Sequence, residues 1–189
     1  MRDIFPINED TYKLFEPYGI TQEDFLRMPA EDHLRLMRGE MTSLMTLKMK
    51  NGEGEDTVQR ARLGLVQGEN GVELRVYPQT DRIEKGELKL SKRDLQKLEE
   101  EGFVYAEMRI RGKRNRYFVQ VDRETNSLLY AKADDISQNI PMDIVGATLT
   151  KEQRDTIRDG QPVTFEANGK KYSIWIDLQF EGGIRLKQL

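Results

Sequence analysis

Alternating apolar and polar residues mark two strands in the second half of the chain, at 117–122 and 172–177. The two segments align without a gap, and each begins with a tyrosine and ends with an aspartate. Successive side chains of a strand point to opposite faces of a sheet, so the alternation predicts one buried and one open face. We interpret the two segments as matching strands of a unit that occurs at least twice.

Each of these strands follows a short helical segment with a recognisable start and stop. Ser91 and Thr150 are N-cap residues by type, and Gln153 completes a capping box with Thr150. Gly102 and Gly160 come after the helical residues, where glycine can end a helix in the left-handed conformation. Hairpin signals follow, so the order helix, glycine, β-meander is predicted in both places.

The pattern divides the chain into three predicted domains. Residues 1–80 form an N-terminal helical segment plus a degenerate α/β-meander unit, residues 81–137 a second helix-plus-meander unit and residues 138–189 a third. The predicted fold class is α+β, with two or three repeated units of a short helix followed by a small antiparallel β-meander. The sequence leaves open whether the first part is a true repeat.

Local signals also predict single elements and the turns between them. Thr21 starts a helix in the first part, and Met41–Met49 reads as a strand with its methionines on one face. Asn51–Asp56 is expected to be a flexible acidic loop, Gly68–Gly71 a hairpin turn and Ala133–Ala147 a connector.

Composition narrows the class of protein. Of 189 residues, 37% are hydrophobic and 33% charged, which predicts a folded chain with a thin core. The net charge of −3 gives no global attraction to nucleic acid or membrane, so any such binding needs a local patch. No apolar run approaches the roughly 18 residues of a membrane span, and Met1–Pro6 lacks the apolar core of a signal peptide. We expect a cytoplasmic location and no membrane partner, and the sequence does not say whether the chain is complete or a fragment.

No signature of catalysis or of a metal or cofactor site stands out. The chain has no cysteine and a single histidine, His33, so zinc sites and cysteine nucleophiles are not expected. Carboxylates at Glu53–Asp56 and Asp134–Asp135 lack the spacing of a calcium loop and read as surface charge. We therefore expect no enzyme, no metal and no cofactor.

One hairpin concentrates positive charge and predicts a nucleic-acid site. Basic residues contact phosphates, and an exposed aromatic ring can stack on a base. The candidate residues are Arg109, Arg111, Lys113, Arg114, Arg116 and Tyr117, with Tyr105 and Phe118 nearby. The alternative is a solvated hairpin whose arginines pair with the acidic helix end at 99–101.

Aromatic residues on the second strand face predict a protein-binding site. Phe118 and Trp175 lie on the face opposite the regular apolar positions, and an uncovered face of this kind would suit a protein partner. The alternative is packing of this face against a neighbouring unit. Open sheet edges offer a second binding mode, by pairing with an extended peptide.

The segment Ile140–Gln153, followed by Gly160, Val163 and the hairpin residues 169–171, resembles a known family. It is similar to uncharacterised repeat modules of Bacteroidetes proteins, often encoded near conjugative or mobile elements, and Tyr18–Phe25 resembles their leading segment. The resemblance implies a capped helix, a glycine and a small β-meander, but no activity to assign to a residue. Its association with mobile elements suggests DNA transfer or maintenance.

The expected function is a non-catalytic interaction module that binds an unknown protein through sheet edges or the aromatic strand face. The alternative is a nucleic-acid-binding accessory protein of a mobile element, which would use the basic hairpin at 109–116 to bind DNA or RNA. The partner and the oligomeric state are open from the sequence.

Overall fold

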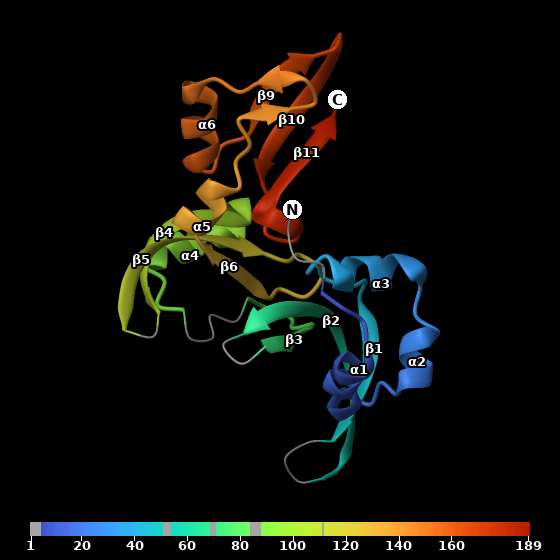
Figure 1. Cartoon of the computed structure of the whole chain (residues 1–189). Coiled ribbons are helices and arrows are strands. Elements are labelled where there is room, and N and C mark those ends of the chain that lie inside the picture. Colours follow the sequence, from blue (N-terminus) through green and yellow to red (C-terminus); the bar gives the residue numbers. More distant parts are fainter. Residues whose placement is uncertain (1–4, 51–53, 69–70, 84–87, 111) are drawn as a thin grey trace. The chain divides into compact units, whose positions relative to one another are not determined.

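The computed structural model describes residues 5–50, 54–68, 71–83, 88–110 and 112–189. In this part, the chain has six α-helices and four small antiparallel sheets of two or three strands (Figure 1), which confirms the predicted α+β class. Contacts divide the chain into two compact units. Unit 1 is Met1–Arg82 with Glu124–Ser127, and unit 2 is Ile83–Arg123 with Leu128–Leu189.

Unit 1 packs short helices on one face of a three-stranded sheet. Its elements are α1 (Glu9–Phe15), the 3₁₀ helix η1 (Glu16–Tyr18), α2 (Gln22–Leu26), α3 (Ala30–Met37), β1 (Met45–Lys50), β2 (Asp56–Gly68) and β3 (Gly71–Pro78), with strand order β1-β2-β3. The fully buried Leu47, Leu63 and Leu65 of the sheet lie in one cluster with Phe15 and Leu36 of the helices. The core of unit 1 therefore lies between the helices and this sheet face.

The predicted helix start at Thr21 is confirmed, because the Thr21 hydroxyl accepts from the Asp24 backbone in a capping box. The predicted strand Met41–Met49 was too long, since β1 begins at Met45. The reason is Thr42, which is fully buried and bonds Leu63 through both its backbone N–H and its hydroxyl. The Leu63 backbone N–H thus donates to the Thr42 hydroxyl and not to a backbone carbonyl, as it would in a regular strand pair.

Two predicted turns of unit 1 fall partly outside the described residues. Of the loop Asn51–Asp56, residues 51–53 are not described, and Asp56 already belongs to β2. Of the turn Gly68–Gly71, residues 69–70 are not described, and Gly68 pairs with Gly71. Gly19, after η1, has φ +72°, and a Cβ on it would collide with the Lys48 carbonyl oxygen, so the chain there needs glycine.

Unit 2 contains two helix-plus-meander segments. The first is α4 (Lys92–Glu101), β4 (Phe103–Ile110), β5 (Lys113–Val121) and β6 (Leu128–Lys132). The second is α6 (Lys151–Arg158), β9 (Val163–Ala167), β10 (Lys170–Ile176), the 3₁₀ helix η2 (Glu181–Gly183) and β11 (Ile184–Gln188). In each sheet the strands lie side by side in the order in which they follow along the chain, β4-β5-β6 and β9-β10-β11, which is the arrangement of a meander.

The local signals of these segments are confirmed. Ser91 accepts from the backbone of Asp94, and Thr150 forms the capping box with Gln153. Gly102 and Gly160 have φ of +80° and +81° at the helix ends.

The connector Ala133–Ala147 was a wrong prediction. It contains α5 (Ala133–Gln138) and the two-stranded ladder of β7 (Asp143–Ile144) and β8 (Ala147–Thr148). A helix of six residues has little intrinsic stability, so the sequence carries only a weak signal for it. Ile136 on α5 is buried in the core of unit 2, and this packing stabilises the helix.

Unit 2 has two hydrophobic clusters. Under α4, Leu98 packs with Val104, Val119 and other inward residues of β4 and β5. The other cluster joins Phe118 of β5 to α5, α6 and the β9–β11 sheet. The first meander thus uses both of its faces for packing. Most of the segment 81–137 lies in one compact unit with 138–189, while residues 81–82 and Glu124–Ser127 belong to unit 1.

Candidate functional site

The pairing register of the basic hairpin β4–β5 shows which of its side chains share a face of the sheet. Cross-strand partners share a face, and Tyr105 pairs with Phe118, Glu107 with Arg116 and Arg109 with Arg114. We call the exposed part of this surface, formed by Tyr105, Glu107, Arg109, Arg114 and Arg116, the arginine face. It brings three of the predicted nucleic-acid residues together.

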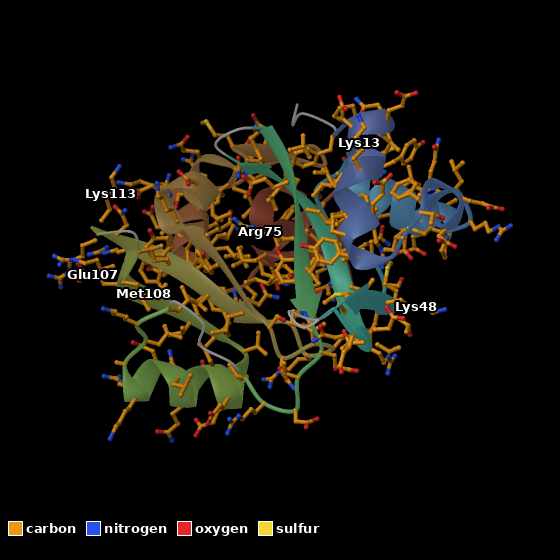
Figure 2. All side chains as sticks on the ribbon, turned by 90° about the horizontal axis from the view of Figure 1, so that it is seen from below. Lys13, Lys48, Arg75, Glu107, Met108 and Lys113 are labelled. Carbon is orange, nitrogen blue, oxygen red and sulfur yellow. The ribbon has the colours of Figure 1, made fainter. Side chains whose placement is uncertain are left out.

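The other predicted nucleic-acid residues do not lie on this face. Lys113 is exposed but pairs with Ile110 on the opposite face of the hairpin, and Figure 2 labels it with Glu107 and Met108. Arg111 lies outside the described residues. Tyr117 was a wrong choice, because it is 4% exposed in the cluster under α4 and cannot stack on a base.

Tyr105 is the aromatic residue that accompanies the arginines. Its side chain is 36% exposed, and its ring lies 5.0 Å from the buried ring of Phe118. Hydrogen bonding to Tyr105 raises the pKa of Arg116, with a smaller contribution from the nearby carboxylates of Glu107 and Asp134. The prediction chose Tyr117 and gave Tyr105 only as a neighbour. The available signal was the alternation, which puts Tyr117 on the apolar face with Val119 and Tyr105 on the face opposite Val104.

An acidic residue partly neutralises the arginine face. Arg114 contacts Glu107 through two nitrogens, at 2.6 Å and 3.0 Å, in a forked ion pair. The predicted alternative was pairing with the helix end at 99–101. Of those residues, Glu101 pairs with Lys97 at 3.8 Å, while Arg109 forms no ion pair within the described residues. The hairpin is therefore less positive than its sequence suggests.

A groove of about 640 Å³ in unit 2 adjoins the arginine face. Its lining residues come from β4, β5, α5 and the end of α6, and they are Tyr105, Arg116, Ala133, Asp134, Ser137, Gln138, Arg158 and Asp159. Two of the lining charges are positive and two are negative. Arg158 also pairs with Asp155 on its own helix at 2.8 Å. The groove thus presents polar groups of both signs beside an exposed tyrosine.

The predicted aromatic strand face is not an open patch. Phe118 is fully buried in the cluster with Ile136 and Ile157, so the alternative of packing against a neighbouring segment holds for this residue. Trp175 is half-buried, and the Arg185 guanidinium lies 5.5 Å from its ring centroid. The cation therefore covers part of the face that was expected to bind a protein.

The two matching aspartates of the predicted repeats are both buried, Asp122 at 1% and Asp177 at 6% exposure. Gln120 donates to Asp177 at 2.9 Å and accepts from the backbone N–H of Leu178 at 2.7 Å. Gln179 donates to Asp122 at 3.2 Å. Each glutamine thus satisfies the aspartate of the other meander, which is a structural role that sequence reasoning missed.

His33 and its acidic neighbour also have structural roles. His33 Nε2 lies 2.7 Å from the Phe25 carbonyl oxygen, and its ring stacks on Phe25 at 4.8 Å. Asp32 is 2% exposed and accepts from the Ser43 backbone at 2.7 Å.

The described part of the chain has neither a cluster of metal-ligating residues nor a helix that could span a membrane. Among the described residues, no group of three or more histidine, aspartate or glutamate side chains could hold a metal ion. Asp134 and Asp135 lie in the first turn of α5, and Glu53 is outside the described residues. No helix in the described part of the chain has the length and apolarity needed to cross a membrane.

Comparison with known proteins found no significant match among protein-family models, curated proteins or solved structures. The resemblance to the Bacteroidetes repeat modules therefore stays a prediction, as does the association with mobile elements.

Proposed function

We propose that this chain is a non-catalytic interaction module that binds a partner protein through the groove of unit 2. The observation that carries the proposal is the exposed Tyr105 beside Arg116, where the arginine face meets the groove. Tyrosine and arginine dominate the binding energy of protein interfaces, because both bury a large area while keeping polar contacts.

The charges of the groove favour a polypeptide over a polyanion. Arg116 and Arg158 would attract acidic side chains, while Asp134 and Asp159 would attract basic ones and repel phosphates. A segment of mixed charge can satisfy both. Sheet edges give a second mode of protein binding, since β4, β6, β9 and β11 are the outer strands of their sheets.

Nucleic-acid binding by the hairpin at 109–116 is the less favoured function. The Arg114–Glu107 pair removes one positive charge from the arginine face, and the buried Tyr117 offers no ring to a base. A polyanion bound there would also meet Asp134 in the groove.

We also infer that the two meanders of unit 2 derive from one repeated unit. The matched N-caps, helix-ending glycines and buried aspartates support this origin, and all of them maintain the fold. Residues that differ between the two copies, such as Tyr105, which has Thr164 at the matching position, are therefore the better candidates for binding. Arg116 matches Lys171, so its positive charge is common to both copies.

The test is to select peptides from a displayed random library on the purified chain and measure their affinity for variants. Tyr105→Ala and Arg116→Ala should each weaken the selected peptides about tenfold, which corresponds to about 1.4 kcal/mol. The matched control is Lys113→Ala, because Lys113 is exposed on the opposite face of the same hairpin. Selected peptides that bind both groove variants as well as the native chain would refute the proposal.

A further inference from the structure

The sheet of unit 1 has a second face, opposite the one on which the helices pack. Leu47, Leu63 and Leu65 point toward the helices, so the alternate residues of the same strands point the other way. Those residues include three exposed cations, Lys48 of β1, Arg60 of β2 and Arg75 of β3. Figure 2 labels Lys48 and Arg75 on this sheet. We call this surface the basic sheet face.

The strand register places the three cations along a diagonal of the sheet. Lys48 is opposite Val58, Arg60 is two residues further along β2, and Arg75 is opposite Gly64. Residues two apart on a strand are about 7 Å apart and neighbouring strands about 5 Å, so the line is about 20 Å long. A row of separated positive charges of this length can follow an extended polyanion.

Two acidic residues on the strands of this face lie toward its ends, and a third, Glu124, pairs with Arg62 between Arg60 and Arg75 at 3.4 Å. Asp56 is the first residue of β2, and Glu73 is opposite Val66 near the other end. The Glu73 carboxylate lies over Gly68, since a Cβ added to that glycine would collide with the carboxylate. The Glu73 side chain therefore points away from Arg75. On the arginine face of unit 2, Glu107 pairs with Arg114, one of the three exposed arginines, whereas Glu124 pairs with the buried Arg62 and not with the three exposed cations of the basic sheet face.

The three cations are not used for packing. Within the described residues, Lys48, Arg60 and Arg75 form no ion pair. Arg62 of the same face is different, since it is 8% exposed, donates to the Thr42 carbonyl at 2.7 Å and pairs with Glu124 at 3.4 Å. Arg62 therefore holds the fold, and the other three are available to a ligand.

Apolar and aromatic surface lies between the cations. Tyr77 is opposite Arg62, and its ring comes within 3.5 Å of a Cβ placed on Gly64, so the ring leans over the glycine. Val58 is 70% exposed beside Lys48. Bases stack on aromatic rings while their phosphates contact cations, and this combination is typical of sheets that bind single strands.

We propose that the basic sheet face of unit 1 binds single-stranded nucleic acid. The proposal does not rest on the protein-binding function of unit 2, because the residues and the ligand are different. Recognition is through the backbone and base stacking, so it tolerates different sequences. The net charge of the chain is −3, so the binding is local and falls steeply with salt.

The test is fluorescence anisotropy of a labelled oligothymidylate of about 20 nucleotides, titrated with the whole chain at several salt concentrations. Three phosphate contacts predict a slope of about −2 for log K against log salt, from about −0.7 per contact. Arg60→Ala with Arg75→Ala should lower the affinity at least about tenfold and reduce the slope to about −0.7. Tyr77→Leu should lower the affinity and leave the slope unchanged, because stacking releases no counterions.

The matched control is Arg109→Ala with Arg114→Ala, which removes two arginines from the arginine face of unit 2. It should change the affinity less than about twofold. Urea midpoints of the arginine variants should match the native chain, since the replaced arginines are exposed. Three results would overturn the proposal. The first is that the native chain does not bind the oligothymidylate at low salt, and the second is that the control pair loses affinity while the Arg60 and Arg75 pair does not. The third is that polyglutamate displaces the oligothymidylate as well as an unlabelled oligothymidylate does, and that Tyr77→Leu leaves the affinity unchanged.

Discussion

Replacing Phe118 with alanine should destabilise unit 2 by about 3–4 kcal/mol. The phenylalanine is fully buried, and its ring stacks on Phe103 at 5.8 Å between centroids. It lies in one cluster with residues of α5, α6 and β10, so its removal leaves a cavity between the two meanders. We place the cost in the lower part of the range for buried phenylalanines, because the neighbouring Tyr105 lines the groove and can relax.

The measurement is urea unfolding followed by the fluorescence of Trp175, the single tryptophan of the chain, and by far-UV circular dichroism. Trp175 is on β10, in the other meander from Phe118. With a slope of about 2 kcal/mol per molar urea, the midpoint should fall by about 1.5–2 M. The same shift should appear in both signals, because the shared cluster makes the meanders unfold together.

Ser173→Ala is the matched control, since Ser173 aligns with Phe118 in the other repeat and is only half-buried. It should change the free energy of unfolding by less than about 0.5 kcal/mol. A loss below about 1 kcal/mol for Phe118→Ala would mean that the ring is not in a packed core. An unchanged Trp175 transition would refute the reasoning that the two meanders share one core.

Three further predictions concern single interactions. Gln120→Ala should cost about 1–3 kcal/mol in urea unfolding, because it removes one of the donors to the buried Asp177 and the acceptor of the Leu178 backbone N–H; an unchanged midpoint would contradict the role of these bonds. Gly19→Ala should destabilise unit 1 by much more than Gly169→Ala destabilises unit 2, because both have positive φ but the surroundings of Gly169 are open; equal losses of Tm would contradict the collision with β1. Hydrogen bonds from Thr21, the helix N-cap, lower the pKa of Asp24. The ionised Asp24 carboxylate therefore stabilises the folded chain above the ordinary pKa of an aspartate, and this stabilisation is lost as the pH falls through the lowered pKa. Asp24→Asn should therefore lower Tm at neutral pH and not in strong acid, and a constant difference at all pH values would refute this assignment.

The basic hairpin shows how far the sequence predicts a site. Its charge and its two strands could be read directly, and Arg109, Arg114 and Arg116 do share a face. The alternation within β5 already separates Lys113 and Tyr117 from Arg114 and Arg116, because residues two apart on a strand share a face. The pairing register decides only that Tyr105 and Arg109 of β4 share the face of those arginines, and a shift of one residue would exchange the faces of β4.

Phe118 shows a different limit. The alternation correctly placed it on the face opposite Val119, but the cover of that face could not be predicted. Part of the cover is α5, whose Ala133 and Ile136 lie in the same cluster and whose six residues carry little helical signal. An aromatic residue on an apparently open face therefore became part of the core.

By itself, the sequence determined the α+β class, the helix caps, the helix-ending glycines and the alternation of the strands. These features depend on residues within a few positions of one another, so local chemistry is sufficient to fix them. The tertiary structure decided which faces are covered, which arginines lie together and which polar residues join the meanders. Gln120 and Asp177 illustrate the reason: they are 57 positions apart, and only the packing of two sheets brings them within 2.9 Å.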